Sequence, residues 1–262
     1  MKISAVILTK NEETNIERCL KTVDFCDEIV IVDDFSEDKT VEIAHKVLNA
    51  QKVYKVLQRR LNGNFSSQRN FGMEKTNGDW ILFVDADETI PDELKKEIKQ
   101  LLSSDPETKD YTAYYIKRRD FFWGRELKFG EIRKARARGV IRLVKRNSGY
   151  WVGNVHEEFK TIGFVTKLTN FINHYPHPTL KEFIEDINFY SSLRAEELYQ
   201  SGKKFCLGEA ILLPFSKFIL TYFIYGGFLD EVPGFTYAFL MSLHSFLVRA
   251  KLFQLYENKK NR

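Results

Sequence analysis

The chain has 262 residues, of which 44% are hydrophobic and 29% are charged. This length allows one sizeable core with a smaller appendage, and the composition is that of an ordinary globular protein. The formal net charge of +4 is too small to indicate a partner by itself. The three cysteines have no metal-ligand spacing and leave one thiol unpaired in any disulfide scheme, which favours a reducing cytoplasm.

The chain begins with an apolar run that ends after Leu8, which is too short for the hydrophobic region of a signal peptide. This run is predicted to be the first strand of a pattern in which strands and amphipathic helices alternate. Such alternation is typical of βαβ units, which build a parallel sheet with right-handed crossovers. The predicted strands are residues 3–8, 28–32, 53–57 and 80–84, and the predicted helices are residues 13–23, 39–48 and 66–75.

Polar residues follow each of these strands at the point where it ends. The carboxyl ends of parallel strands meet at one edge of a sheet, and open α/β sheets bind their ligands there, so four polar clusters in register predict a nucleotide site. Asp85 and Asp87 follow the buried fourth strand, where two carboxylates can hold a hard divalent cation that shares its oxygens with a phosphate. The clusters are residues 9–12, 33–36, 58–60 and 85–87.

The middle of the chain changes character. Residues 117–146 carry twelve Lys and Arg side chains against three acids, with aromatic residues between them. Two interpretations stay open, a solvated loop or a surface for anionic partners such as lipid headgroups or a phosphorylated acceptor. No nucleic-acid-binding motif accompanies this charge, so no nucleic-acid partner is expected. Around it we predict a helix at residues 92–102, strands at 111–117, 140–144 and 163–171, and a helix at 179–200 that Thr179 caps.

The last third is the most apolar part of the chain. Residues 210–229 and 232–248 form two runs, interrupted by Pro214, by Gly226 with Gly227, and by Pro233. Three interpretations remain: membrane spans, aromatic-rich helices that lie in a membrane interface, and a buried helical hairpin. Flanking Lys and Arg residues favour the interfacial helices, since basic residues beside an apolar face attract anionic lipid.

Four motifs in the first half together resemble glycosyltransferase family 2, whose enzymes use nucleotide sugars and have the GT-A fold. They are residues 7–12 (ILTKNE), 31–40 (IVDDFSEDKT), 68–72 (QRNFG) and 84–88 (VDADE), and the resemblance covers residues 1–175. Residues 142–146 (RLVKR), 155–157 (VHE), His174 and 227–230 (GFLD) resemble the bacterial branch with the lipopolysaccharide-core β-1,4-glucosyltransferases. The chain departs from the usual pattern at Phe35, where many members have a smaller residue, and at Glu231, where Gly is common.

The resemblance implies an α/β fold with a mixed, mostly parallel sheet, flanking helices and a C-terminal helical, apolar extension. It implies a glycosyltransferase domain at residues 1–178, with a nucleotide-sugar half (1–103) and an acceptor half (104–178), followed by a membrane-associating helical region (179–262). The residues that it assigns to the nucleotide sugar, with UDP as the default nucleotide, are Thr9, Asn11, Glu12, Asp33, Asp34, Gln68, Arg69 and Asp85.

The resemblance also implies a metal site and a catalytic base. Asp85 and Asp87 would hold Mg²⁺ or Mn²⁺ with His174 as a third ligand, although a lone His is more often structural. An inverting transfer needs a general base on the acceptor side, for which Glu157 is the candidate and Glu158 the reserve. Two alternatives stay open: Glu157 pairs with a nearby arginine, and Arg69, expected at the start of its helix, pairs with an acid instead of the diphosphate.

The expected function is therefore metal-dependent, inverting transfer of a hexose to a lipid-linked or lipopolysaccharide-core glycan of the cell envelope. The expected partners are a nucleotide sugar, a glycan or glycolipid acceptor and a membrane surface, with a homo-oligomer as an open alternative. The expected location is the cytoplasm, on the inner face of the cytoplasmic membrane. Transfer to polyprenyl phosphate and non-catalytic binding of a nucleotide sugar are the alternative functions.

Overall fold

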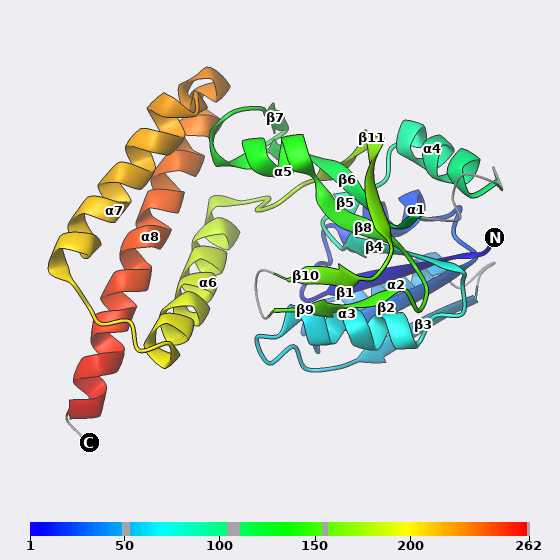
Figure 1. Cartoon of the computed structure of the whole chain (residues 1–262), viewed down its shortest axis with the longest axis horizontal. Helices are drawn as coiled ribbons and strands as arrows, with labels where there is room; N and C mark the ends of the chain where they lie inside the picture. Colours follow the sequence, from blue (N-terminus) through cyan, green and yellow to red (C-terminus); the bar gives the residue numbers. More distant parts are fainter. Residues whose placement is uncertain (49–52, 104–110, 154–156, 261–262) are drawn as a thin grey trace. The chain divides into compact units, whose positions relative to one another are not determined.

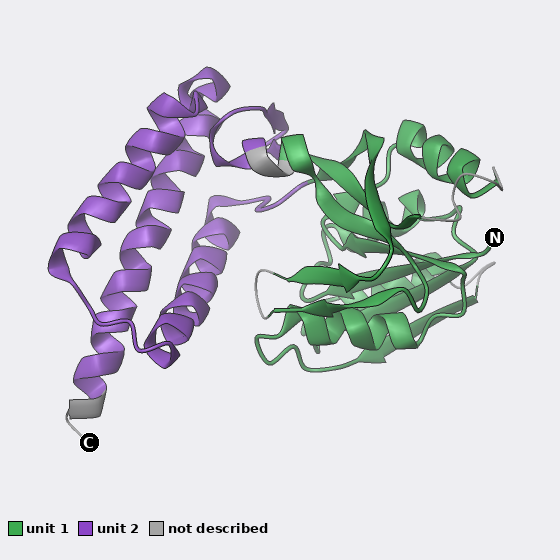
Figure 2. Cartoon of the chain, viewed as in Figure 1, with its two compact units in different colours: residues 1–119, 135–174 green, residues 120–134, 175–262 purple. Residues whose placement is uncertain are grey.

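The computed structural model describes residues 1–48, 53–103, 111–153 and 157–260 of the chain. It divides into two compact units, which Figure 2 shows in different colours. Unit 1 comprises Met1–Arg119 and Ala135–His174, and unit 2 comprises Asp120–Lys134 and Tyr175–Arg262. The expected functional division after residue 178 stays a prediction.

The first half of unit 1 has the predicted alternation of strands and helices (Figure 1). Four strands run parallel in the order β3-β2-β1-β4. The first helix begins three residues later than predicted, because residues 12–15 form a turn in which the Asn15 N–H donates to the Glu12 carbonyl. The elements are β1 (Ile3–Thr9), α1 (Ile16–Thr22), β2 (Glu28–Asp33), α2 (Thr40–Leu48), β3 (Val53–Gln58), α3 (Phe65–Glu74) and β4 (Trp80–Asp85).

The second half of unit 1 extends this sheet with antiparallel strands. The complete order is β3-β2-β1-β4-β8-β6-β11-β5, and β9 and β10 form a separate hairpin. Residues 117–146 are no solvated loop, because most of them lie in strands and short helices. In chain order the elements from residue 88 to residue 174 are β5 (Glu88–Thr89), α4 (Asp92–Ser103), β6 (Tyr111–Phe122), β7 (Arg125–Leu127), η1 (Gly130–Ile132), α5 (Arg133–Arg138), β8 (Val140–Lys145), β9 (Gly149–Val152), β10 (Glu158–Thr161) and β11 (Phe164–His174), of which β7 and η1 belong to unit 2.

Both faces of the central strands are buried, which explains why their sequences are continuously apolar. On β4, Leu82 and Val84 join the cluster that contains residues of α1, α2 and α4, while Ile81 and Phe83 join Trp151 of β9 on the other face. The backbone of α3 lies directly against this second face. A Cβ atom at Gly72 of α3 would lie 2.5 Å from a methyl group of Val6, so this contact needs a glycine.

Unit 2 consists of three long helices with the 120–134 segment packed against them. Phe122, Leu127 and Ile132 of that segment share a buried cluster with Phe183 of α6 and Leu240 of α8. The predicted cap of α6 is present, since the Thr179 hydroxyl accepts from the Glu182 N–H at 3.2 Å. The elements are α6 (Leu180–Gln200), α7 (Leu207–Ile219), a π-helical turn η2 (Leu220–Ile224), η3 (Gly227–Asp230) and α8 (Glu231–Lys260). The predicted α/β class with a C-terminal helical extension is confirmed.

The outer face of α7 and η2 is apolar and exposed. Leu207, Ile211 and Phe215 recur every four residues, so they lie close together on one side of α7, and each is more than half exposed, as is Phe223 of η2. By length and composition, the stretch Leu207–Ile224 is the one candidate for a membrane-crossing helix among the described residues. This exposure shows that α7 is not buried within unit 2, as the interpretation of a buried helical hairpin required.

Candidate functional site

The strand register brings the four polar clusters of the sequence to one edge of the sheet. Thr9 lies beside Asp33 in the β1–β2 pair, and Asp33 lies beside Gln58 in the β2–β3 pair. Asp85 ends β4 beside Leu8, one residue before Thr9. Because these strands are parallel, their carboxyl ends form a continuous polar edge, as an open α/β sheet needs for binding a ligand.

The cluster after β1 is ordered by its own hydrogen bonds. The Asn11 side chain accepts from the Glu37 N–H at 2.8 Å, and the Asn11 N–H donates to the Ser36 hydroxyl at 2.8 Å. Glu12 accepts from the Asn15 amide at 2.8 Å. The buried Thr9 hydroxyl has no hydrogen-bond partner among the described residues. Thr9 is therefore the group of this cluster with bonding capacity left for a ligand.

The two acids after β2 differ in their surroundings. Asp33 is fully buried, and its carboxylate accepts from the hydroxyl and the N–H of Ser36 at 2.5 and 3.0 Å. Asp34 is partly exposed and accepts from the Leu61 N–H at 3.0 Å. Phe35 lies between them and Ser36 with a positive φ of 53°, and the guanidinium of Arg60 lies 4.3 Å from its ring centre. Asp33 thus orders the loop, whereas Asp34 is accessible to a ligand.

Gln68 faces a neighbouring arginine rather than the sheet edge. Its side-chain oxygen accepts from Arg59 at 2.8 Å, and its amide donates to the Arg59 carbonyl at 2.7 Å. Both polar atoms of Gln68 are therefore engaged inside the protein. A role for Gln68 in binding the donor would be indirect, through the position of Arg59.

Asp85 lies between two buried arginines that come from different parts of the chain. Its carboxylate contacts Arg69 of α3 at 3.1 Å and Arg142 of β8 at 2.5 Å. Arg142 also contacts the fully buried Glu88 at 2.6 Å, and Glu88 accepts from the Asp85 N–H at 2.9 Å. Both arginine side chains are only 5% exposed. Four charged side chains thus form one buried cluster, which we call the Asp85 cluster.

The charges within the Asp85 cluster determine its protonation. Burial opposes the ionisation of Asp85, but Arg142 and Arg69 outweigh it and hold the pKa of Asp85 far below its ordinary value. Burial raises the pKa of Glu88 despite the neighbouring Arg142. Burial would lower the pKa of Arg142, but Asp85 and Glu88 raise it instead. Asp85 is therefore an anion and Arg142 a cation at neutral pH.

Arg69 extends the Asp85 cluster to the candidate base. Its Nε atom lies 2.8 Å from a carboxylate oxygen of Glu157, and its guanidinium lies 5.2 Å from the ring centre of Trp151. Arg69 lies in the second turn of α3 and not at its start, because Asn64 is the N-cap and accepts from the Ser67 N–H. Both ion-pair alternatives are therefore observed. Glu157 pairs with Arg69, and Arg69 also pairs with Asp85.

Asp87, which follows β4, contacts His174 of β11. Nε2 of His174 lies 3.0 Å from a carboxylate oxygen of Asp87, and His174 is the last residue of β11, opposite Glu88 in β5. Burial opposes the ionisation of Asp87, but His174 outweighs it and lowers the pKa of Asp87.

The two side chains fit part of a divalent metal site. Two neighbouring ligands of an octahedral Mg²⁺ ion lie about 3 Å apart, which matches the Asp87–His174 distance. Among the described residues, no group of three or more His, Cys, Asp and Glu side chains converges on one point. Asp85 is engaged by arginines, so the remaining ligands of an ion here would come from water and phosphate oxygens, as is usual for Mg²⁺.

Glu158, the reserve candidate for the base, points away from the cluster. It lies on β10, its side chain is 72% exposed, and it pairs with Lys160 at 2.8 Å. His156 of the VHE motif lies outside the described residues. Of the two glutamates, only Glu157 contacts the Asp85 cluster.

Sequence reasoning assigned no role to Glu88 or Arg142. Glu88 directly follows the paired acids, and Arg142 opens the RLVKR motif, so both stood within recognised motifs. Their pairing joins residues 54 positions apart. A motif alone does not show such a contact.

Known sequences resemble this chain over most of its length. The sequence model described as "Glycosyl transferase family 2" matches residues 4–167. An uncharacterized glycosyltransferase of Rickettsia typhi is 30% identical, over 99% of this chain and 89% of its own length. The lipopolysaccharide core biosynthesis glycosyltransferase LpsC of Rhizobium meliloti is 28% identical, over 97% of this chain and 93% of its own length.

Solved structures share the fold. The mannosyltransferase PcManGT of Pyrobaculum calidifontis, in complex with GDP-Man and Mn²⁺, has a TM-score of 0.56 and 13% identity, over 96% of this chain and 87% of its own. TarS 1–349 of S. aureus, in complex with UDP-GlcNAc, has a TM-score of 0.50 and 19% identity, over 96% of this chain and 84% of its own.

Replacing Arg142 with Gln leaves Asp85 and Glu88 buried without their shared cation. We expect the free energy of unfolding to fall by about 3 kcal/mol, since removing one partner of a buried ion pair costs roughly 3–5 kcal/mol. Urea denaturation at pH 7 measures this loss. Arg146→Gln is the matched control, because Arg146 is exposed and donates to the Thr76 carbonyl; it should cost less than about 1 kcal/mol. Equal losses in both variants would contradict the account.

Proposed function

Since the chain belongs to glycosyltransferase family 2 and has the GT-A fold, we propose that it transfers a hexose from a nucleotide sugar to a cell-envelope glycan, in a metal-dependent reaction with inversion. The observation that carries this proposal is the sequence of contacts from Asp85 through Arg69 to Glu157. It connects the carboxyl edge of the parallel strands to a carboxylate that can act as a base.

The donor would lie along the carboxyl edge of β1, β2 and β4. The Thr9 hydroxyl can donate or accept a hydrogen bond, and the Asp34 carboxylate can accept one from a base N–H or a ribose hydroxyl. Asn11, Glu12 and Asp33 would act through the loops that they order. Donors of this chemical class occur in the complexes of PcManGT with GDP-Man and of TarS with UDP-GlcNAc. We propose UDP as the nucleotide of this chain.

Asp87 and His174 would hold Mg²⁺ or Mn²⁺ beside the donor diphosphate. A divalent ion there neutralises the charge that develops on the leaving nucleoside diphosphate. Asp85 would then serve a different purpose. As an anion between two arginines, it fixes Arg69 in the orientation from which Arg69 contacts Glu157.

Glu157 would take the proton of the acceptor hydroxyl. One of its oxygens, Oε1, is held by Arg69, so Oε2 is the atom that would receive the proton. As the proton leaves, the acceptor oxygen bonds to the anomeric carbon and the bond from that carbon to the diphosphate oxygen breaks. A single displacement of this kind inverts the anomeric configuration. The fixed carboxylate also favours catalysis over mere binding of a nucleotide sugar.

The acceptor class rests on sequence similarity and on the surface of unit 2. LpsC is named for biosynthesis of the lipopolysaccharide core, which makes a lipid-linked core glycan our proposed acceptor. The exposed apolar face of α7 and η2 would hold the protein on the inner surface of the cytoplasmic membrane, where such an acceptor is found. The same apolar face would suit a polyprenyl phosphate, which remains the alternative acceptor.

Replacing Glu157 with Gln removes the proposed base but keeps the shape of the side chain. We expect the transfer rate to fall by about a hundredfold or more, with donor affinity almost unchanged, since general base catalysis contributes roughly 10²–10⁴-fold. Steady-state kinetics and calorimetric donor binding measure the two effects. Glu158→Gln is the matched control and should retain its rate. Near-normal turnover of Glu157→Gln would remove Glu157 from this role.

Replacing His174 with Ala removes one of the two proposed metal ligands. We expect the affinity for Mn²⁺, measured by calorimetry in the presence of UDP, to fall at least tenfold, because each ligand contributes directly to holding the ion. His177→Ala is the control, since His177 belongs to unit 2 and pairs with Asp186. Unchanged Mn²⁺ affinity in His174→Ala would exclude His174 as a ligand.

Replacing Phe215 and Phe223 together with Ser should release the protein from membranes. Each Phe contributes roughly 2 kcal/mol when buried in an apolar environment. Co-flotation with vesicles that contain anionic phospholipid measures the loss. Ile162→Ser is the control, since Ile162 of unit 1 is fully exposed. Vesicle binding that survives the double replacement would contradict an interface on α7. A wild-type protein that dimerises through this face and ignores vesicles would contradict the membrane proposal.

A further inference from the structure

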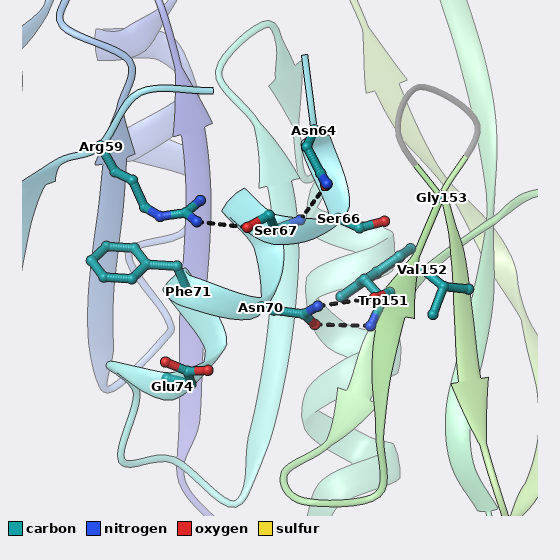
Figure 3. Close-up of a pocket in the computed structure, with 10 residues that line it drawn as sticks. All are labelled: Arg59, Asn64, Ser66, Ser67, Asn70, Phe71, Glu74, Trp151, Val152 and Gly153. Atoms are coloured by element: carbon teal, nitrogen blue, oxygen red, sulfur yellow. Dashed lines mark hydrogen bonds between the residues drawn. The ribbon is translucent and has the colours of Figure 1, made fainter. Parts of the chain in front are cut away.

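An open pocket of about 390 Å³ lies between the start of α3 and strand β9 in unit 1 (Figure 3). Its walls include Arg59, Asn64, Ser66, Phe71 and Trp151. Apart from Arg59, which belongs to the polar cluster after β3, none of these residues belongs to the proposed donor or metal sites. The pocket therefore needs an explanation of its own.

The start of α3 gives the pocket a positive end. The first N–H groups of a helix lack partners within the helix, and its dipole places partial positive charge there. The Asn64 side chain caps the N–H of Ser67 at 2.8 Å. Anions with several oxygens are the ligands that helix N-termini commonly bind. A helix start alone does not make a site, but here two buried side chains add to it.

Ser66 and Trp151 line this pocket, and each has a buried polar atom that has no hydrogen-bond partner among the described residues. Ser66 is 4% exposed and Trp151 is 5% exposed, and both the Ser66 hydroxyl and the Trp151 indole N–H are unpaired. Figure 3 shows the Ser66 hydroxyl directed away from α3, toward the side where Val152 and Gly153 lie. Leaving buried polar groups unpaired costs free energy, so a ligand that pairs with them is stabilised.

The polar groups of the pocket wall that could still bind a ligand are mostly hydrogen-bond donors. The Arg59 guanidinium is fixed at the wall by bonds to Gln68 and Ser67 at 2.8 and 2.6 Å, and it keeps its positive charge there. An indole N–H can only donate, and a hydroxyl can donate. Glu74, near the end of α3, is the one acid that lines the pocket. Such surroundings select a ligand rich in acceptor oxygens.

The pocket lies beside the candidate base. Ser66 and Arg69 are three residues apart on α3, so they share a face of the helix, and Arg69 contacts Glu157. The Asn70 side chain clamps the backbone of Trp151 with bonds of 2.9 and 2.8 Å, which fixes β9 against α3. Trp151 of the pocket wall also lies 5.2 Å from the guanidinium of Arg69, so one side chain separates the pocket from the residue that holds Glu157.

We propose that this pocket binds an anionic group of the acceptor, a phosphate or a carboxylate, and so orients the acceptor hydroxyl toward Glu157. The inference rests on the proposed glycosyl transfer and adds a chemical requirement for the acceptor. An acceptor without the anionic group would be used with a higher KM, while the donor would bind as before.

The test observes the pocket directly in the full-length protein. The chain has three tryptophans, so ¹⁵N-tryptophan labelling gives three indole N–H signals. Inorganic phosphate is titrated in the presence of UDP and Mg²⁺, which occupy the donor site. The Trp151 signal should shift and saturate. The Trp80 indole, which donates to Met1 at 3.3 Å, and that of the exposed Trp123 should not shift. A parallel titration with acetate distinguishes a phosphate from a carboxylate site.

Variants of the pocket complete the test. Ser66→Ala should weaken phosphate binding by about threefold to tenfold, which corresponds to the loss of one hydrogen bond. Glu74→Gln should tighten it, because a negative charge near the bound anion is removed. No shift of Trp151 with either anion, or equal affinities in the wild type and both variants, would overturn the proposal.

Turnover assays distinguish this inference from the proposed function. A protein that transfers no sugar, yet binds phosphate beside Trp151, would refute glycosyl transfer and with it the acceptor role of the pocket. A protein that transfers sugar with the same acceptor KM in the wild type and in Ser66→Ala would refute the pocket proposal alone.

Discussion

The structure of unit 1 depends on how two neighbouring carboxylates, the partly buried Asp85 and the fully buried Glu88, are balanced by cations. Charges that leave water lose their hydration, and they are tolerated only when partners of opposite charge replace it. Arg142 reaches them from β8, and Arg69 reaches Asp85 from α3. Elements far apart in the sequence must therefore pack together before the end of β4 is stable.

The need of these carboxylates for cations also explains why Asp85 and Asp87 have different partners. Arg69 contacts both Asp85 and Glu157, so the acid at the donor edge and the candidate base share one cation. Asp87 lies one residue beyond Ala86 and pairs with His174 instead. The two acids of the pair thus have different surroundings: Asp85 is engaged by two arginines, and Asp87 is the acid that we propose holds a metal ion together with His174.

The strands, their parallel arrangement and the polar edge could be predicted from sequence, because the alternation of strand and helix is a local pattern and the polar clusters follow the predicted strand ends. The Asp85–Arg142 pair could not be predicted, since it joins residues 57 positions apart. Several other arginines near Arg142 in the sequence were equally plausible partners of Asp85. Gln68 belonged to a recognised motif, but its two bonds to Arg59 depend on the packing of α3 against the end of β3. For α7, hydropathy identified an apolar run, but only packing showed that its outer face is exposed.

The most direct test of the central claim is a double-mutant cycle between Asp85→Asn and Arg142→Gln, measured as the free energy of unfolding in urea. If the two charges depend on each other, the double variant should lose less stability than the sum of the single losses. We predict a coupling energy of at least about 1 kcal/mol, within the range of roughly 0.5–3 kcal/mol found for residues in contact. Additive losses would show that Asp85 and Arg142 act independently and would contradict the account.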